Sequence, residues 1–347
     1  MGVHYLKPAL TLEQQADLLI QRGMLGARDV MIARLATVSY YRLSAYWYTF
    51  RCEGTEQLRS GTHFDHVWER YVFDQRLRVL VIEAIERIEV AVRTKVAHLH
   101  AHAYGPFGYA TTPRSLPGLN ANDESDAWSH KAFLKEVRKC IHRSREAPFV
   151  KHFRERYRSE NDLPIWMAME LLSFGTVARM YQGAGNQIRQ PIAASYDLKI
   201  SELASWLVML NDVRNICAHH GRLWNRKLVK QPSLPNHNDW KLPVRVDTTT
   251  VFAALTTCSY LLMRISPDGK WQRRVRALVE DYPWSSTMSS APSAPSARGW
   301  KMGLPKNWLE CPIWAAASAH PLAQGLPLHA LAGREQSAAT ELRQPGS

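Results

Sequence analysis

Apolar residues recur at helical spacing along most of the chain. The longest such segment spans residues 63–105 and carries one apolar stripe with a repeat near 3.6 residues, formed by Val72, Leu77, Leu80, Ile85, Ile88, Val92 and Val96. Glu83–Arg87 and Glu89–Arg93 are i,i+4 pairs with the acid first, which stabilises a helix. We therefore expect one long helix with a salt-bridged outer face.

Shorter helices are predicted on both sides of this segment. Thr11 is the expected N-cap of the first one, with Gln14 at the third helical position and Gly23 as the stop. The aromatic residues from Tyr40 to Tyr48 are expected to pack in a core or an interface. Residues 106–127 are rich in Pro, Gly, Thr, Ser and Asn and predict a loop. Helical patterns resume over 126–146, 163–183 (with a break near Gly175), 201–228 and 248–266.

No segment shows convincing strand alternation, so the sequence predicts an all-α protein. Residues 282–299 are rich in Ser, Ala and Pro and predict a linker. We expect residues 1–281 to form one helical domain and residues 300–314 to be its C-terminal segment. Residues 315–347 are Ala-rich and polar without a core pattern, which predicts a disordered tail.

The charge balance points to a polyanionic partner. The chain has 44 Lys and Arg against 31 Asp and Glu, a formal net charge of +13. Nucleic acid is the first candidate and a membrane surface the second, although a basic but ordinary enzyme also fits. Five irregularly spaced cysteines without a C-x-x-C pair predict reduced thiols in a cytoplasmic protein. The sequence contains neither a secretory h-region nor an apolar run of membrane-spanning length, so we expect neither secretion nor a membrane span. Of the two candidate partners we expect nucleic acid, not a membrane.

The stretch "RNICAHHGRLWNR", residues 214–226, gathers the candidate chemistry. With Asn211 at zero on a helix, Arg214 falls at about 300°, Asn215 at about 40° and His219 at about 80°. These residues share a polar stripe, which also holds Arg222 if the helix continues past Gly221. His220 falls on the apolar face and is expected to pack there, so His219 is the candidate for chemistry.

These side chains suit the cleavage of RNA. Histidine can take a proton from a 2′-hydroxyl or give one to a leaving 5′-oxygen near neutral pH. Arg214 would hold the phosphate and stabilise its developing charge, and Asn215 would orient either group. Such an attack needs no metal. Arg214 and His219 diverge by about 140°, so they would flank a groove that a second copy could close around a two-fold axis. By spacing alone, a solvated polar face would be favoured because the pattern is short.

A wider resemblance changes this balance. "LNDVRNICAHHGRLWNR" resembles the R-N-x-x-x-H motif of the HEPN superfamily, in the form found in Abi-like (AbiD/AbiF-type) proteins of bacterial abortive infection. Other stretches resemble that family in the expected order, namely "KPALTLEQQADLLIQRGM", "ATVSYYRLSAYWYTFR", "FDHVWERYVFDQRLRVLVIEAIERIEVAVRT", "PIWMAMELLSFGTVARMY" and "KMGLPKNWLECPIW". The resemblance covers roughly residues 5–314.

The resemblance implies a HEPN-type helical bundle with additional N-terminal helices. It also implies a cofactor-free, metal-independent endoribonuclease with a composite site between two protomers. By position, Arg214 and His219 are the catalytic pair and Asn215 the polar residue between them. The biological role would be phage defence by abortive infection, or that of a toxin restrained by an RNA or protein antitoxin encoded elsewhere.

Further residues are expected around this pair. Supporting roles are assigned to Glu89, Arg93, Glu170 and Asn211, and RNA contacts to Arg222 and Arg226. Two alternative functions remain. The protein could be a non-catalytic RNA-binding or regulatory module that uses the same groove. It could also be a zinc hydrolase, because His98 and His102 have the i,i+4 spacing of zinc ligands, although an exposed helix end explains them better. The basic runs "KEVRKCIHRSR" and "KWQRRVR" are solvated faces or phosphate contacts.

Overall fold

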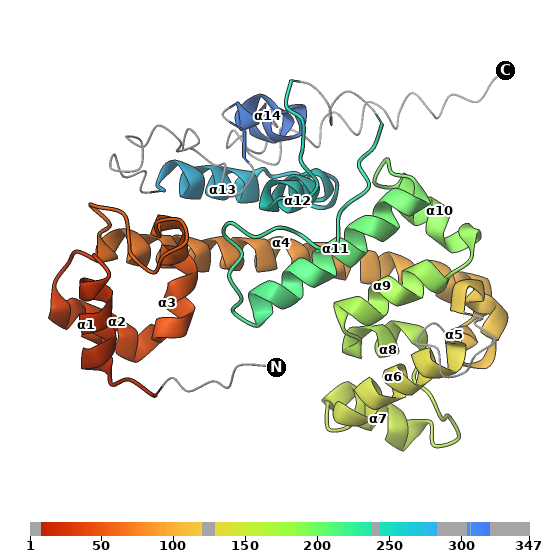
Figure 1. Ribbon diagram of the computed structural model, residues 1–347. Coiled ribbons are helices and arrows are strands. Elements are labelled where there is room, and N and C mark those ends of the chain that lie inside the picture. The colour runs from red at the N-terminus through yellow and green to blue at the C-terminus, as the bar shows by residue number, and fades with distance from the viewer. Residues whose placement is uncertain are drawn as a thin grey trace, which may run out of the picture.

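Helices make up the regular structure of the protein (Figure 1). The computed structural model describes residues 8–119, 129–236, 240, 243–282, 304–305 and 307–319. Within these ranges there is no strand, and isolated bridges join Leu25 to His63 and Arg51 to Leu58. The predicted all-α class is confirmed. None of the helices described is both long and apolar enough to cross a membrane.

The axis of the fold is α4 (Phe64–Tyr104), a helix of 41 residues. The long helix predicted from the apolar stripe is therefore confirmed. Six of the seven stripe positions are buried, and Val72 is half-buried. Helices α3, α8, α10, α11, α12 and α13 all contact α4. Of the two predicted ion pairs, Glu89–Arg93 forms, whereas Glu83 pairs with Arg274 of α13 at 2.6 Å because that helix packs alongside.

The N-terminal lobe contains α1 (Leu12–Gln21), α2 (Arg28–Val38) and α3 (Tyr40–Trp47), followed by a 3-10 turn at Tyr48–Phe50. The predicted capping box is present, because Gln14 N donates to Thr11 Oγ1 at 3.2 Å and Thr11 N donates to Gln14 Oε1 at 2.9 Å. Gly23 follows the end of α1 with a φ of +91°, as expected for a stop.

The aromatic residues of this lobe are less uniformly packed than expected. Tyr46 and Trp47 are buried, but Tyr41 is 89% exposed and Tyr48 is 42% exposed. Helix α3 has only eight residues and turns only one side to the core, so Tyr41 faces away from it. The expectation that all of these aromatic residues pack is wrong for Tyr41.

A second lobe follows α4. The predicted loop contains α5 (Gly108–Thr111) and 3-10 turns at Pro113–Ser115 and Pro117–Leu119, and residues 120–128 lie outside the described part. The lobe continues with α6 (His130–Arg143) and α7 (Pro148–Arg156).

The predicted helix over 163–183 is two helices, α8 (Ile165–Leu171) and α9 (Phe174–Gly183). The predicted break near Gly175 is present and lies at Leu172 and Ser173. Both residues are extended, and the Ser173 side chain caps α9 by accepting from Thr176 N at 3.3 Å. Helices α10 (Asn186–Ala194) and α11 (Ile200–Ala218) follow, and α11 crosses α4 and lies along α9 (Figure 1).

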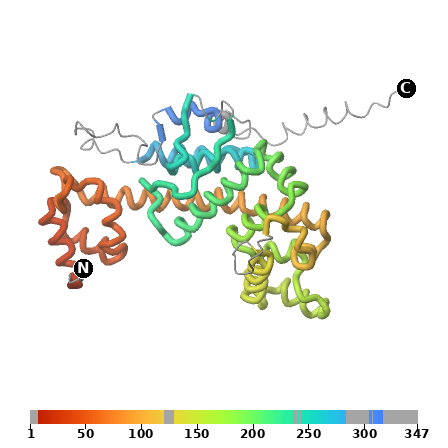
Figure 2. Tube along the Cα trace, turned by 45° about the vertical axis from the view of Figure 1, so that its right-hand side comes forward, coloured from red at the N-terminus to blue at the C-terminus, as the bar shows by residue number. Residues whose placement is uncertain are grey.

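The last helices are α12 (Val251–Ile265), α13 (Lys270–Glu280), a 3-10 turn at Trp308–Glu310 and α14 (Pro312–Ala319). Figure 2 shows them on one side of α4 and α5–α9 on the other. Trp314 Nε1 donates to Thr256 Oγ1 at 3.1 Å, so α14 packs on α12. Helix α14 runs beyond residue 315, where the tail was expected to begin. The predicted linker after Tyr282 and the tail from residue 320 lie outside the described residues.

Candidate functional site

Helix α11 ends at Ala218, just before the two histidines of the motif. His220 N donates to Cys217 O at 3.0 Å and Gly221 N donates to Ile216 O at 2.7 Å. His220 itself has a φ of +56°. This is the Schellman arrangement, in which a left-handed residue terminates a helix.

This ending corrects the helical phases predicted beyond Ala218. His220 is exposed instead of packed on the apolar face, and Arg222 lies in the following loop instead of on the polar stripe. Upstream, the phases hold. Of the residues predicted on the apolar face, Ile216 is half-buried. The others are buried, namely Trp206, Met209, Leu210, Val213 and Cys217.

The three residues expected to carry the chemistry lie along the last part of α11 and at its cap. Arg214 and Asn215 are half-buried, and Arg214 Nη1 donates to Asn215 Oδ1 at 3.3 Å. His219 occupies the C-cap with φ −87° and ψ 14°. Its side chain is exposed and has no hydrogen bond to any residue in the described ranges. Arg214 and His219 do not contact each other within one chain.

Three of the expected supporting residues form an ion-pair cluster on α4 and α8. Arg93 Nη2 donates to Glu89 Oε1 at 2.5 Å and to Leu172 O at 3.0 Å. Arg93 Nη1 lies 3.8 Å from Glu170 Oε2, whose side chain is 61% exposed. Burial raises the pKa of Glu89, and the charges of Arg93 and Arg214 act in the opposite direction. Arg214 of α11 therefore acts electrostatically on this carboxylate of α4.

Asn211, the fourth supporting residue, lies against α9. A Cβ added to Gly175 would be 3.2 Å from Asn211 Nδ2, so the glycine leaves room for this amide. Glu89, Arg93, Asn211 and Arg214 thus gather where α4, α9 and α11 meet, whereas His219 lies at the end of α11, next to His220, whose carbonyl contacts Arg42 of α3.

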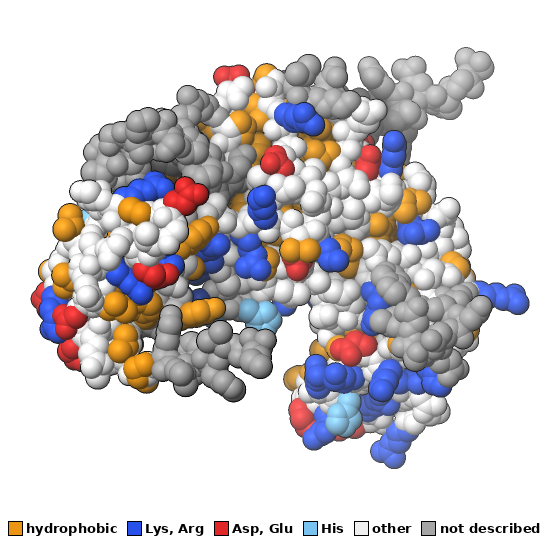
Figure 3. Space-filling view, viewed as in Figure 1, with side chains coloured by type: hydrophobic (Ala, Val, Ile, Leu, Met, Phe, Trp, Pro, Cys, Tyr) orange, Lys and Arg blue, Asp and Glu red, His pale blue; other side chains and the backbone are white. Residues whose placement is uncertain are grey.

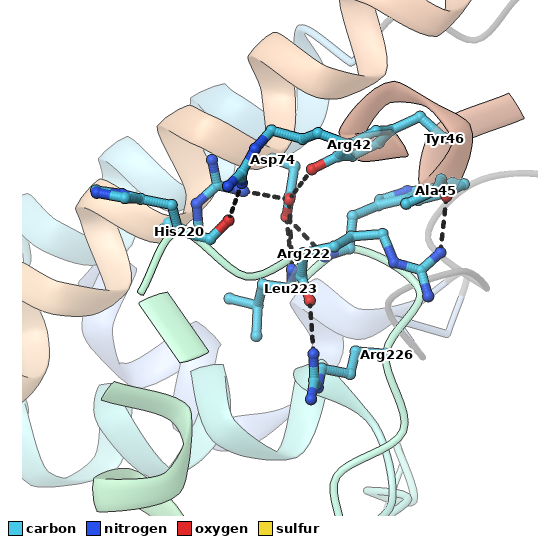
Figure 4. Close-up of polar contacts among 10 residues, drawn as sticks. Arg42, Ala45, Tyr46, Asp74, His220, Arg222, Leu223 and Arg226 are labelled. Atoms are coloured by element: carbon cyan, nitrogen blue, oxygen red, sulfur yellow. Dashed lines mark hydrogen bonds and ion pairs between the residues drawn. The ribbon is translucent and has the colours of Figure 1, made fainter. Parts of the chain in front are cut away.

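The two arginines expected to bind RNA follow α11 in the loop (Figure 4). Arg222 Nη1 donates to Ala45 O at 2.9 Å, and its guanidinium lies 5.0 Å from the centre of the Tyr48 ring. Arg226 is exposed, and its one polar contact with a residue that the structure describes is a donation to Arg222 O at 3.4 Å. Arg222 is therefore partly engaged within the protein, and Arg226 is the more available of the two cations.

Asp74 holds this loop, a role that the sequence analysis missed. Its carboxylate is fully buried in α4. Trp224 N donates to it at 2.6 Å, Leu223 N at 3.1 Å and the Tyr46 hydroxyl at 2.6 Å, and Arg78 forms an ion pair with it (Figure 4). Burial raises the pKa of Asp74, opposed by Arg78 and these hydrogen bonds. The available signal was an acid within an apolar stretch with an arginine four residues later.

Helix α3 holds the same loop from the other side. Arg42 Nη1 donates to His220 O at 2.5 Å, and Asn225 Nδ2 donates to the Tyr48 hydroxyl at 2.6 Å. Figure 4 shows Arg42 and Asp74 directed at the chain that follows α11, and Arg222 of that chain directed at Ala45. The backbone next to His219 is thereby fixed by residues from two other helices.

His98 and His102 line a neighbouring cavity. It has a volume of about 440 Å³, and its lining includes Arg93, Glu170 and Trp166, whose side chain is 52% exposed. The two imidazole rings lie 4.4 Å apart. In the described part of the chain, no group of three or more His, Cys, Asp or Glu residues could hold a metal ion.

Comparison with known proteins places these features in a family. The model of the family described as "Abi-like protein" matches residues 33–225. No curated protein and no solved structure matches the chain. The match covers more than half of the 347 residues and contains the α4 cluster, Asp74 and the segment from Arg214 to Asn225. The chain therefore belongs to the Abi-like family.

Proposed function

We propose that this protein is a metal-independent endoribonuclease of the HEPN type. It would act in the cytoplasm in abortive infection against phage, or as the toxin of a toxin–antitoxin pair with its antitoxin encoded elsewhere. Membership in the Abi-like family supports the link to abortive infection. The residues at the end of α11 support the catalytic step.

One observation carries the proposal. His219 is exposed at the end of α11 with no hydrogen-bond partner among the described residues, and Arg214 and Asn215 lie on the preceding turn. An uncommitted imidazole can accept the 2′-hydroxyl proton and return it to the leaving 5′-oxygen. Arg214 would bind the scissile phosphate. The products would be a 2′,3′-cyclic phosphate and a 5′-hydroxyl.

A homodimer would complete the site. Arg214 and His219 lie on one helix end without mutual contact, so a second copy would bring its own pair to the same phosphate. In Figure 3 the surface is hollowed between the lobe of α1–α3 and the lobe of α6–α7, with the end of α11 between them. An RNA strand lying in this hollow would pass His219 and Arg226.

The test is cleavage of a labelled RNA by the purified protein in the presence of a chelator. His219→Ala should lose at least about a hundred-fold in rate, since general acid–base catalysis contributes about that much or more. Arg214→Ala should lose a similar factor.

The matched control is His220→Asn. It removes the adjacent exposed imidazole while keeping a residue type that tolerates the left-handed conformation, and it should cut like the wild type. Equal cleavage by His219→Ala and wild type would refute the catalytic assignment. Salt-sensitive RNA binding without cleavage by the wild type would instead favour a binding module.

A further inference from the structure

A second basic feature lies away from α11, in the lobe of α6 and α7. The two helices enclose an open cavity of about 800 Å³. Ile141 and Val150, both buried, contribute its floor. Five cationic side chains line it, namely Arg138, Arg145, Lys151, Arg154 and Arg158.

Three of these cations have no acidic partner among the residues that the structure describes. Lys151 makes no ion pair or hydrogen bond with a residue in the described ranges. Within the same ranges, Arg154 and Arg158 donate to backbone, the carbonyls of Glu160 at 3.5 Å and Glu155 at 3.3 Å respectively. All three residues are exposed.

The other two cations are compensated within the lobe. Arg138 forms two hydrogen bonds of 2.9 Å with Asp162, and Arg145 lies 3.3 Å from Glu146. Glu155 also lines the cavity, without an ion pair in the described part of the chain, and the three cations Lys151, Arg154 and Arg158 outnumber it. The excess positive charge therefore lies along α7 and just beyond its end.

The whole lobe is basic. Residues 130–162 contain ten Lys and Arg against five Asp and Glu, an excess of five in a chain whose total is +13. Figure 3 shows Lys and Arg side chains gathered over this lobe. A concentration of positive charge around a cavity attracts a polyanion.

Exposed aromatic rings accompany the charge. Phe149 is 39% exposed at the start of α7, and Tyr157 is 48% exposed at its C-cap. Neither ring belongs to the lining of the cavity, but each directly precedes a lining residue, Val150 and Arg158. The Tyr157 ring also has the Arg156 guanidinium 5.9 Å from its centre. Basic grooves with accessible aromatic rings are typical of single-stranded nucleic-acid binding, because the cations follow the backbone and the rings stack on bases.

We propose that the α6–α7 cavity binds single-stranded RNA through its phosphates. Lys151, Arg154 and Arg158 contact the backbone, and Tyr157 stacks on a base. The inference deepens the proposed function, on which it rests for the identity of the ligand. The site would hold the substrate strand at a distance from His219 and takes no part in bond cleavage.

The test is fluorescence anisotropy with a labelled oligouridylate, using the full chain with His219→Ala to prevent cutting. The variant Lys151→Glu/Arg154→Glu/Arg158→Glu should bind at least about ten-fold more weakly, and its dependence of log K on log salt should be shallower by about two to three. Tyr157→Ala should weaken binding about five-fold or more, and Tyr157→Phe should not.

A matched charge reversal outside both basic runs is the control. Arg59→Glu/Arg76→Glu/Arg245→Glu changes the same charge at exposed positions outside the cavity, where none of the three side chains forms an ion pair with a described residue. It should retain affinity within about two-fold when the salt is high enough to screen remote charges. Circular dichroism would verify that both triple variants keep their helices.

Three results would overturn the inference. They are an unchanged affinity of the α6–α7 variant, an equal loss in the control variant, and a wild type that prefers an acidic polypeptide to RNA or binds no RNA. Failure of the proposed function looks different. If RNA binds in the cavity but is never cut, the proposed nuclease function fails and the α6–α7 binding site stands. If the α6–α7 variant cuts RNA normally and binds it with unchanged affinity, the binding site fails and the nuclease function stands.

Discussion

Replacing Asp74 tests how the loop after α11 is held. Asp74→Ala removes a buried carboxylate that accepts from Leu223 N, Trp224 N and the Tyr46 hydroxyl. It also leaves the Arg78 guanidinium, whose side chain is 7% exposed, without its acidic partner. Breaking one side of a buried ion pair costs about 3–5 kcal/mol, and each amide left without an acceptor adds about 1–3 kcal/mol.

These terms overlap because they share one carboxylate, so we expect the free energy of unfolding to fall by at least about 3 kcal/mol. That is a large part of the about 5–15 kcal/mol that stabilises a typical domain. Asp74→Asn keeps one acceptor oxygen for Leu223 and Trp224 and should lose less.

Urea denaturation followed by tryptophan fluorescence measures this change. Asp17→Ala is the matched control, because it removes an acid from the exposed pair with Arg28, and exposed pairs contribute little. The exchange of the Leu223 and Trp224 amides in Asp74→Asn reports whether the loop itself loosens. A loss below about 1 kcal/mol in Asp74→Ala would refute the role given to this carboxylate.

Three further predictions concern a buried histidine, the ion pair on α4 and the cysteines. Burial lowers the pKa of His100 to about 4, below the value of about 6.5 in an unfolded chain. Its contribution to stability is therefore complete above about pH 6.5 and declines by up to about 3 kcal/mol as the pH falls toward 4. Urea midpoints measured at several pH values will show this loss, and His100→Gln should make the midpoint depend less on pH. Arg93→Met should lower the free energy of unfolding by about 2–3 kcal/mol, since it removes the partner of half-buried Glu89. Arg28→Met, which breaks an exposed pair, is the control, and a smaller loss in Arg93→Met than in this control would contradict the stabilising role of the Arg93–Glu89 pair. Of the five cysteines only Cys52 is exposed, so one thiol should react rapidly with a disulfide reagent in the folded protein and all five after unfolding.

The elements set by local sequence could be predicted. The apolar stripe of α4 depends on the helical repeat alone, and the capping box at Thr11 depends on two residues three positions apart. The face of α11 that packs was also predictable as far as Cys217, because helical phase determines which side chains turn to the core.

Features that depend on distant residues could not be predicted. The end of α11 is set by a left-handed His220, a conformation usually taken by glycine, and Gly221 next to it suggested a later stop. Glu83 takes a partner 191 positions away in the sequence. The Asp74 carboxylate meets the Leu223 and Trp224 amides only once α4 and α11 have packed. For the same reason, the sequence marked the motif at Arg214 but not the residues that hold it.

The central claim is that His219 cuts RNA. The most direct measurement is induction of the wild type, His219→Ala and His220→Asn in a bacterial host, with total RNA integrity as the readout. If His219 cuts RNA, the wild type and His220→Asn will give RNA fragments and arrested growth, and His219→Ala will leave the RNA intact. The same fragments from His219→Ala as from the wild type would contradict this claim.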